Sequence, residues 1–318
     1  MSNEALGLPV AEPLWRIRLR LLWRGLRSNW SLFAENRIGL VGLGIILVFA
    51  VMVVAHPILM NTVWDARTYD PVVGYSFDET EQPAAPSARH LLGTDPLGRD
   101  VLSQLMWSAK WEFALGIIAA LVTVIVGTLV GAMAAYFGGV VDAILMRIAD
   151  VFVMMPTLSL LIVLGVVIPG GLSIFRLALV IGIVSGFGAT AIVLKSQALG
   201  LSVKTYIDAA RVAGGSSFHI IFVHLIPNLM PLAFLYMMFT VTAAIFSEAV
   251  LSFFGILDVR MSWGLMIHTS QSAGYLLAGT RYWWLLMPAG LSITLLCGSF
   301  YLVGRALDEV VNPKLRSR

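Results

Sequence analysis

The side chains that most often do chemistry are few in this sequence and are not spaced for catalysis. Its five histidines form no HExxH pattern, since the closest two, His219 and His224, lie five residues apart rather than four. No GxSG-like sequence offers a serine nucleophile, and the single cysteine, Cys297, excludes a CxxC metal pair. None of the four lysines follows a glycine, so the chain lacks the G-x4-G-K-[ST] loop that holds the phosphates of ATP. We therefore expect no enzyme, no catalytic residue, no metal site and no cofactor in this chain.

A polar interruption between two long apolar runs, Lys204–Asn228, is better suited to binding a partner. Residues Tyr206–Ala213 have the period of a short helix, the Gly214-Gly215 pair permits a sharp bend, and Phe218–Leu225 predicts a second helix that ends before Pro227. Small alanine side chains let a groove on another protein approach the backbone, and the aromatic and aliphatic residues add apolar contact area. The pattern favours a docking site, while a simple loop helix packed on a membrane is an equally good interpretation.

The elements that carry this loop are membrane helices. Only 12% of the 318 residues are charged and 58% are apolar, with a mean hydropathy of +0.87, so a folded chain in water would lack a polar surface. The first apolar run and the basic region before it are both too long for a cleaved signal peptide. An all-α membrane protein with six spans is predicted, on the apolar runs at residues 38–55, 113–137, 143–168, 174–194, 229–256 and 284–303.

The distribution of basic residues predicts the orientation. With both termini in the cytoplasm, 14 Lys and Arg residues fall on the inner side and 7 on the outer side, as the positive-inside rule requires. The outer seven are Arg67, Arg89, Arg99, Lys110, Arg176, Arg260 and Arg281. No basic run with interleaved aromatics points to nucleic acid. We expect a cytoplasmic segment with an amphipathic helix at residues 1–37, the first span at residues 38–60 and an external region at residues 61–110. A five-helix core that contains the loop 203–227 is expected at residues 111–307, and a cytoplasmic tail at residues 308–318.

Two further features concern the spans themselves. Gly127 and Gly131 form one GxxxG pair and Gly182 and Gly186 another, which predicts close helix packing within one subunit or against a partner subunit. Glu248, beside Ser247, is the only acid that we place deep in a span, where a charge costs about 2.5–3.5 kcal/mol on insertion scales. Both residues are candidates for a pathway or a structural polar role, whereas Glu112 is expected at a span end.

The polar interruption also carries a family resemblance. Asp208-Ala209-Ala210, Gly214 and Ile226-Pro227 resemble the EAA loop, E-A-A-x3-G-x9-I-x-L-P, of the membrane subunits of bacterial ABC importers. The sequence departs from that pattern with Asp208 for Glu, His224 at the Ile position and Ile226 at the Leu position. The first change keeps the charge, and the run from His224 to Asn228 is similar to the H-I-L-P-N form of the dipeptide and oligopeptide branch.

The resemblance to that branch extends from about residue 38 to the C-terminus. Residues His90–Ser103 are similar to the HLLGTDxLGRDxLS stretch of the dipeptide-permease C-type subunit. Further motifs follow in the family's order, at residues 136–139, 247–249, 251–255, 262–264 and 312–316.

The resemblance implies a type I ABC importer transmembrane fold with a cytoplasmic coupling-helix loop, in the bacterial cytoplasmic (inner) membrane. It implies a heterodimer with a homologous second permease subunit, two separate ATP-binding subunits that bind ATP and Mg, and an external substrate-binding protein. The ATPase-coupling residues that it implies are Asp208, Ala209, Ala210, Arg211, Gly214, His224, Ile226 and Pro227. Di- and oligopeptides are the implied substrates.

Several alternatives stay open at this point. Similar permeases carry nickel chelates, glutathione or oligosaccharides, and the external binding protein largely sets the specificity. A different class, an ion-coupled secondary transporter, is expected to show inverted repeats and several membrane-embedded carboxylates, of which this sequence offers only Glu248. Copurification with an ATPase separates the two classes.

Overall fold

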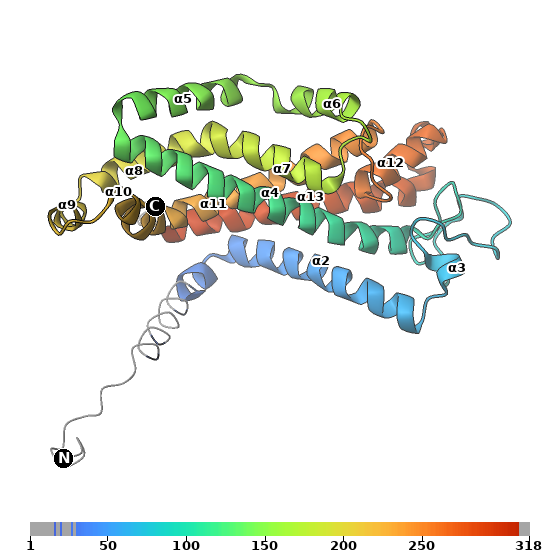
Figure 1. The fold of residues 1–318 in the computed structure, drawn as a ribbon. Helices are drawn as coiled ribbons and strands as arrows, with labels where there is room; N and C mark the ends of the chain where they lie inside the picture. The colour runs from blue at the N-terminus through green and yellow to red at the C-terminus, as the bar shows by residue number, and fades with distance from the viewer. Residues whose placement is uncertain (1–15, 17–19, 21–26, 28–29, 312–318) are drawn as a thin grey trace, which may run out of the picture.

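The part of the chain that the structure describes is built from helices. The computed structural model describes residues 16, 20, 27 and 30–311, so most of the predicted amphipathic N-terminal helix and the tail from residue 312 lie outside the described residues. Within these ranges the only strand-like pairings are two single bridges, one between residues 94 and 100 and one between residues 172 and 257. The predicted all-α fold class is confirmed for this part of the chain (Figure 1).

Five helical segments in the described ranges are long and apolar enough to cross a membrane. Each has at least 26 residues, where about 20 are enough to span the hydrocarbon core. The five are α2 (Arg37–Thr62); α4 (Val101–Phe137); α7 (Ile174–Ser185) with η2 (Gly186–Thr190) and α8 (Ala191–Ser202); α10 (Ser217–His219) with η3 (Ile220–Leu225) and α11 (Ile226–Phe253); and α13 (Trp283–Val311), preceded by the 3-10 turns of η4 (Tyr275–Tyr282).

The remaining apolar run is a broken helix. The sequence predicts one continuous span over residues 143–168, but α5 (Gly139–Met154) and α6 (Thr157–Val167) meet at an angle of 83°. Pro156 lies in the break, and because proline has a fixed φ and no N–H, it ends the helix that precedes it. Counted as one span, the pair brings the number of candidate spans to six; the expectation of a continuous helix is wrong.

The loop before α4 ends at residue 100. The Asp100 side chain accepts a hydrogen bond from the Ser103 N–H at 2.7 Å and so caps a helix that begins at Val101. Residues 101–110 of the predicted external region 61–110 are therefore the first turns of α4, which has 37 residues; their place outside the membrane stays a prediction. The short helix α3 (Ala66–Tyr69) lies within this region.

The central helix of the bundle is α4, which contacts α2, α7, η2, α8 and α11. The two GxxxG pairs interlock along it. A Cβ atom on Gly131 would lie 2.8 Å from the Lys195 backbone nitrogen, and one on Gly182 would lie 2.8 Å from the Ala119 carbonyl oxygen. Of the two predicted uses of these glycines, the structure shows packing within one subunit.

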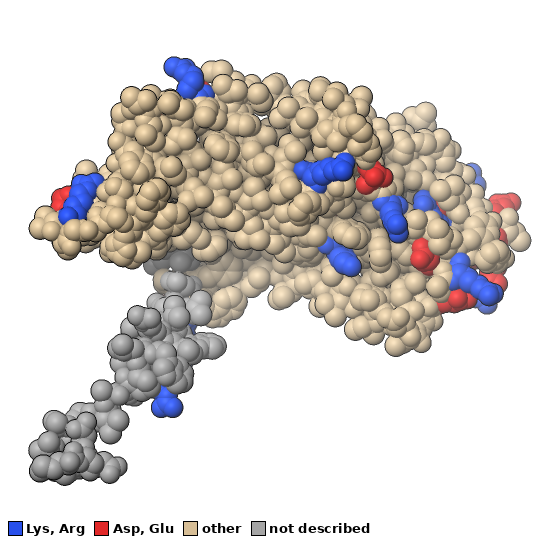
Figure 2. All heavy atoms as spheres, in the orientation of Figure 1, with Lys and Arg blue, Asp and Glu red and all other residues tan. Residues whose placement is uncertain are grey.

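The bundle has two different ends. One, which we call the α9 end, carries α9 (Thr205–Val212), α10 and the turn at Gly138 (left in Figure 1). The start of α2 meets the end of α13 there, where Asn36 Nδ2 donates to Glu309 Oε2 at 2.5 Å. The opposite end, the α3 end, carries α3, the loop before α4 and α12 (Trp263–Ser272). In Figure 2 most charged side chains on the visible face gather toward the α3 end, a smaller group lies on α9, and the surface between is largely uncharged.

Candidate coupling loop and buried polar clusters

A helix–bend–helix unit at the α9 end is anchored firmly to the membrane helices. The helix α9 covers almost the same residues as the first predicted helix of the loop. Its Ile207 is fully buried, and it belongs to an apolar cluster whose other members come from α4, α8, η3 and α11. The fully buried members of that cluster around the loop are Leu194, Ala198, Ile220, Leu225 and Leu229. The inner side of α9 is therefore packed tightly against the helices beside it.

The bend after α9 depends on a glycine. Gly214 has a φ of +82°, in the left-handed region that side chains rarely adopt, and its N–H donates to the Arg211 carbonyl at 3.0 Å. The Gly215 N–H donates to the Ala210 carbonyl at 2.9 Å. These two bonds form a Schellman motif, which reverses the chain and satisfies two carbonyls at the end of α9. The predicted sharp bend at the glycine pair is confirmed.

The second helix of the loop does not end before Pro227, as the sequence predicts. It continues through α10 and the π-turn η3 into α11, so residues 217–253 form one helical segment. The π-turn lets the Ile226 N–H reach the Ile221 carbonyl, and Asn228 Nδ2 donates to the His224 carbonyl at 2.7 Å. Pro227 stands in the first positions of α11, where a proline is tolerated, so the helical segment passes through it.

The surface of the loop is apolar and exposed. Val212 is 90% exposed and Phe218 is 63% exposed, at the tip of a segment whose other side is fully buried. Between them, the Arg211 guanidinium donates to Asp208 Oδ1 at 3.1 Å and lies 5.4 Å from the centre of the Tyr136 ring. The result is an apolar tip with one fixed ion pair beside it, and the exposed apolar side chains on it are Val203, Tyr206, Val212, Phe218, Phe222 and Val223.

The predicted coupling residues fall into two groups. Asp208, Ala209, Arg211 and Gly214 are exposed on α9 and its bend, and Ala210 is half-buried under them. His224, Ile226 and Pro227 lie on the following helix, where His224 is half-buried and Pro227 is exposed. The two groups meet through Tyr206, whose ring centre lies 6.4 Å from that of His224.

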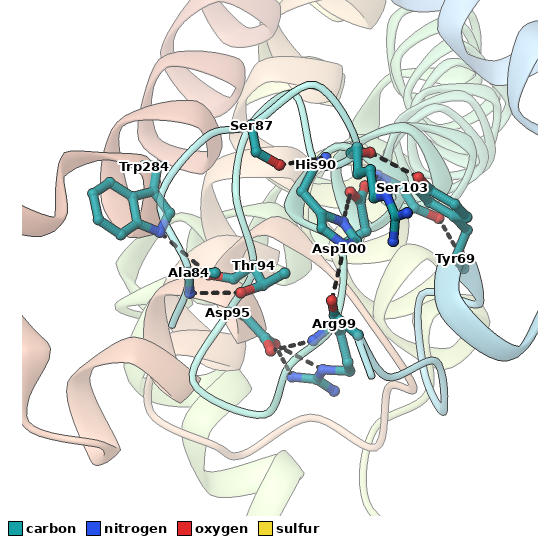
Figure 3. A network of polar contacts seen from close by, with 12 residues as sticks. Tyr69, Ala84, Ser87, His90, Thr94, Asp95, Arg99, Asp100, Ser103 and Trp284 are labelled. Atoms are coloured by element: carbon teal, nitrogen blue, oxygen red, sulfur yellow. Dashed lines mark hydrogen bonds and ion pairs between the residues drawn. The ribbon is translucent and has the colours of Figure 1, made fainter. Parts of the chain in front are cut away.

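A second polar cluster fixes the loop at the α3 end (Figure 3). His90 Nδ1 lies 2.8 Å from Asp100 Oδ2, and His90 Nε2 lies 3.0 Å from Ser76 Oγ, and all three residues are buried. The Trp284 indole N–H donates to the Thr94 carbonyl at 3.2 Å and so ties the same loop to α13. Together with the Asp100 cap, these bonds hold the 76–100 segment against the starts of α4 and α13.

The hydrogen bonds that join Ser76, His90 and Asp100 follow the order of a catalytic triad. Because these residues are buried, we assign them a structural role. Ser76 is fully buried, so no substrate reaches its Oγ, and the Asp100 carboxylate also caps α4. Beside this set, burial and the nearby Asp100 carboxylate raise the pKa of Tyr69, whose hydroxyl donates to the Arg89 carbonyl at 2.7 Å. Sequence reasoning did not connect these residues, because only the fold brings them together.

Two acids on the span helices are buried within the protein. Glu112 on α4, expected at a span end, is 1% exposed and interacts with Glu248 on α11, which is also 1% exposed. Ser252 Oγ donates to Glu248 Oε1 at 2.5 Å, whereas Oε2 of each glutamate has no hydrogen-bond partner among the described residues. Both glutamates are therefore buried by protein, whereas the expectations that Glu112 lies at a span end and that Glu248 is the only acid deep in a span stay predictions. Ser247 is buried beside the pair.

Known proteins resemble the chain over most of its length. Residues 127–317 match the model of the family described as binding-protein-dependent transport system inner membrane component. The dipeptide transport system permease protein DppC of Bacillus subtilis (strain 168) is 35% identical over 91% of this chain and 86% of its own length. The oligopeptide transport system permease protein OppC of the same strain is 33% identical, over 89% and 88%.

A relative with a different printed substrate is also similar. The glutathione transport system permease protein GsiD of Pectobacterium atrosepticum is 28% identical over 92% of both chains. The family match covers more than half of the chain and includes the helix–bend–helix unit. The chain is therefore a multi-pass inner membrane protein that belongs to the family of binding-protein-dependent transport system inner membrane components.

Proposed function

We propose that this chain is one permease subunit of an ABC importer that carries di- or oligopeptides across the cytoplasmic membrane by alternating access. It pairs with a homologous permease subunit, two ATP-binding subunits supply the ATP hydrolysis with Mg, and an external binding protein delivers the substrate. The names of the relatives at 33% and 35% identity support the substrate class. The absence of a phosphate-binding loop from the sequence supports a separate ATPase.

The proposed orientation places the α9 end in the cytoplasm. The starts of α2 and α5, the helix α9 and the end of α13 share this end, in agreement with the count of basic residues. Both termini are then cytoplasmic, and the polar cluster around His90 faces the side of the membrane on which the binding protein lies.

The observation that carries the proposal is the two-sided loop at the α9 end. Its inner side, around Ile207, is fully buried against the spans, while its outer side presents exposed Val212 and Phe218. An exposed apolar tip on a rigid base is suited to fill a groove on an ATPase subunit. The buried base then transmits the opening and closing of the two ATPases to the bundle.

A charge on the outer side of α9 tests this role. Ala209 is exposed in the isolated chain, so Ala209→Asp leaves its folding intact but puts a carboxylate into the proposed contact. We expect ATP-dependent peptide uptake by the complete importer to fall at least about ten-fold, with less ATPase copurifying on the permease. Val140→Asp, an equally exposed change at the same end outside the loop, serves as the matched control.

The results separate the alternatives. Normal uptake and normal ATPase assembly in Ala209→Asp, or in the more disruptive Gly214→Asp, contradict the coupling role. Uptake that follows an ion gradient without any ATPase supports a secondary transporter. Glutathione, nickel chelates or oligosaccharides taken up in place of peptides leave the coupling role standing and change the substrate only; the relative named for glutathione makes that substrate the first to test.

Glu248 and Ser247 are proposed as structural polar residues. Both are buried within the chain, and Glu248 interacts with Glu112 and Ser252 rather than with an open surface. Unchanged substrate affinity in Glu248→Gln and Glu248→Ala, combined with lower thermal stability in Glu248→Ala, supports this assignment; a changed affinity with normal stability favours a pathway role.

A further inference from the structure

A groove of about 300 Å³ lies between three of the span segments, away from both polar clusters. The junction of α5 and α6 contributes Thr157, the segment around η2 contributes Ser185, and α11 contributes Tyr236. Its volume is at the lower limit of typical ligand sites. None of the residues that line it is charged; the others are Phe152, Val153, Val184, Gly188, Ala189, Thr190, Phe239, Thr240 and Ala243.

The groove lies along the spans, toward the α9 end of the bundle. Gly188 is midway along the helical segment Ile174–Ser202, whereas Tyr236 is in the half of α11 nearer the α9 end, where it interacts electrostatically with Asp308 near the end of α13. The break at Pro156 lies between α5 and α6. All three lining segments are apolar enough to cross a membrane, so the groove lies within the membrane.

Polar groups in this groove lack partners. The hydroxyls of Thr157, Ser185 and Tyr236 form no hydrogen bond with any described residue, whereas Thr240 Oγ1 donates to the backbone of its own helix at 3.0 Å. A hydroxyl that faces hydrocarbon without a partner is unfavourable. These side chains therefore fit a groove that water or a polar ligand occupies.

The backbone beside the groove is irregular as well. Gly188 has φ and ψ of −75° and −123°, outside the helical region, within the π-turn η2. The neighbouring span is broken at Pro156. Irregular backbone at membrane depth is tolerated only where it is buried in protein or lines a water-filled cavity, and both breaks border the same groove.

We propose that this groove is a wall of the translocation pathway and that it binds the backbone of the transported peptide. An acyl chain offers no hydrogen bonds, and a transmembrane helix of a partner subunit satisfies its own backbone internally. An extended peptide brings free N–H and C=O groups, which the unpaired hydroxyls can bond. Because the lining has no charge, such a site accepts peptides without regard to the charge of their side chains.

This assignment rests on the proposed function, and its test uses the complete importer with its binding protein in proteoliposomes. In a Cys297→Ala background, Ser185→Cys places a thiol in the groove, and Val51→Cys places one within the span on the exposed side of α2. A membrane-impermeant cationic methanethiosulfonate should modify the groove thiol at least about ten-fold faster than the control thiol. Trialanine, added with ATP during turnover, should slow the modification of Ser185→Cys only.

A second pair of variants tests the same site by size. Ser185→Trp should lower trialanine uptake at least about ten-fold while ATPase assembly stays normal, and Val51→Trp should stay within about two-fold of the unchanged importer. Equal thiol rates at the two positions, no protection by trialanine, or full uptake by Ser185→Trp overturns the assignment. Failure of the unchanged importer to take up trialanine instead overturns the peptide substrate, and is recognised before any variant is made.

Discussion

Lys195 Nζ lies 2.5 Å from Asp142 Oδ1 and joins α8 to α5 near the α9 end. Both side chains are less than one-third exposed, so solvent screens the pair only in part. The pair links the first turn of the broken span to the helix that leads into α9. The ion pair therefore connects α5, which contributes to the proposed pathway, with α8, which leads into the proposed coupling loop.

Breaking this pair should destabilise the bundle. We expect Lys195→Met to cost about 1–2 kcal/mol, between the values for exposed and buried pairs, because Asp142 keeps its charge without a partner. The exchange of both residues, Asp142→Lys with Lys195→Asp, should recover part of the loss. Thermal unfolding of the detergent-solubilised protein measures both; additive losses in the double variant would show that the pair contributes nothing.

The bend after α9 should tolerate only glycine without a cost. Gly214→Ala places a side chain at a φ of +82° and should cost about 1 kcal/mol locally, loosening the exposed tip and lowering ATP-dependent uptake. Gly200→Ala on α8, where a Cβ meets no atom within 4 Å, is the control and should be neutral or slightly stabilising. Hydrogen exchange of the α9 amides reports the loosening directly, and equal exchange in the two variants would contradict it.

The sequence predicted the apolar segments and the loop, but not which prolines interrupt helices. Pro156 and Pro227 both stand in or beside apolar runs, yet the first ends a helix and the second is absorbed into one. The difference depends on the π-turn η3, which leads into α11 just before Pro227 and whose geometry no residue pattern announces. Local propensity therefore predicts that a helix exists more reliably than it predicts where the helix bends.

Long-range polar partners were the other feature that the sequence did not reveal. His90 and Asp100 appeared only as parts of a family motif, and their link with Ser76 depends on how the loop folds back. Glu112 was expected at a span end, but it is buried and its partner is Glu248, far away in the sequence. By contrast, the bend at Gly214 followed from local backbone chemistry and was predicted correctly.

The interlocked glycines should be intolerant of larger side chains. A Cβ on Gly131 would lie 3.0 Å from the Ala191 carbonyl and closer still to the Lys195 nitrogen, both backbone atoms that can move only with their helix. We expect Gly131→Val to lower stability by about 1–3 kcal/mol through separation of α4 from α8. Gly44→Ala on α2, with open space around it, should leave the thermal unfolding temperature unchanged. The same result for both variants would contradict the proposed close contact.

The stability of the polar cluster at the α3 end should depend on Asp100 more than on Ser76. Asp100→Ala removes both the cap of α4 and the partner of His90, and we expect a loss of about 2–4 kcal/mol from two buried hydrogen-bonding roles. Ser76→Ala removes one hydrogen bond and should cost about 1 kcal/mol. Limited proteolysis of the 76–100 segment measures the difference. Equal protection in the two variants would show that the segment does not depend on the cap.

The buried glutamates should behave as a pair that carries a proton. Two ionised carboxylates side by side, with no ion pair to either among the described residues, would repel each other in a medium that screens poorly. An amide resembles a protonated carboxyl in shape and charge, so either single Glu→Gln change, at 112 or 248, should leave thermal stability within about 1 kcal/mol of the original. Glu112→Ala removes the contact and leaves a cavity, and it should cost about 2–5 kcal/mol. If Glu112→Gln were as destabilising as Glu112→Ala, both carboxyls would have to be ionised, and an unseen cation would have to balance them.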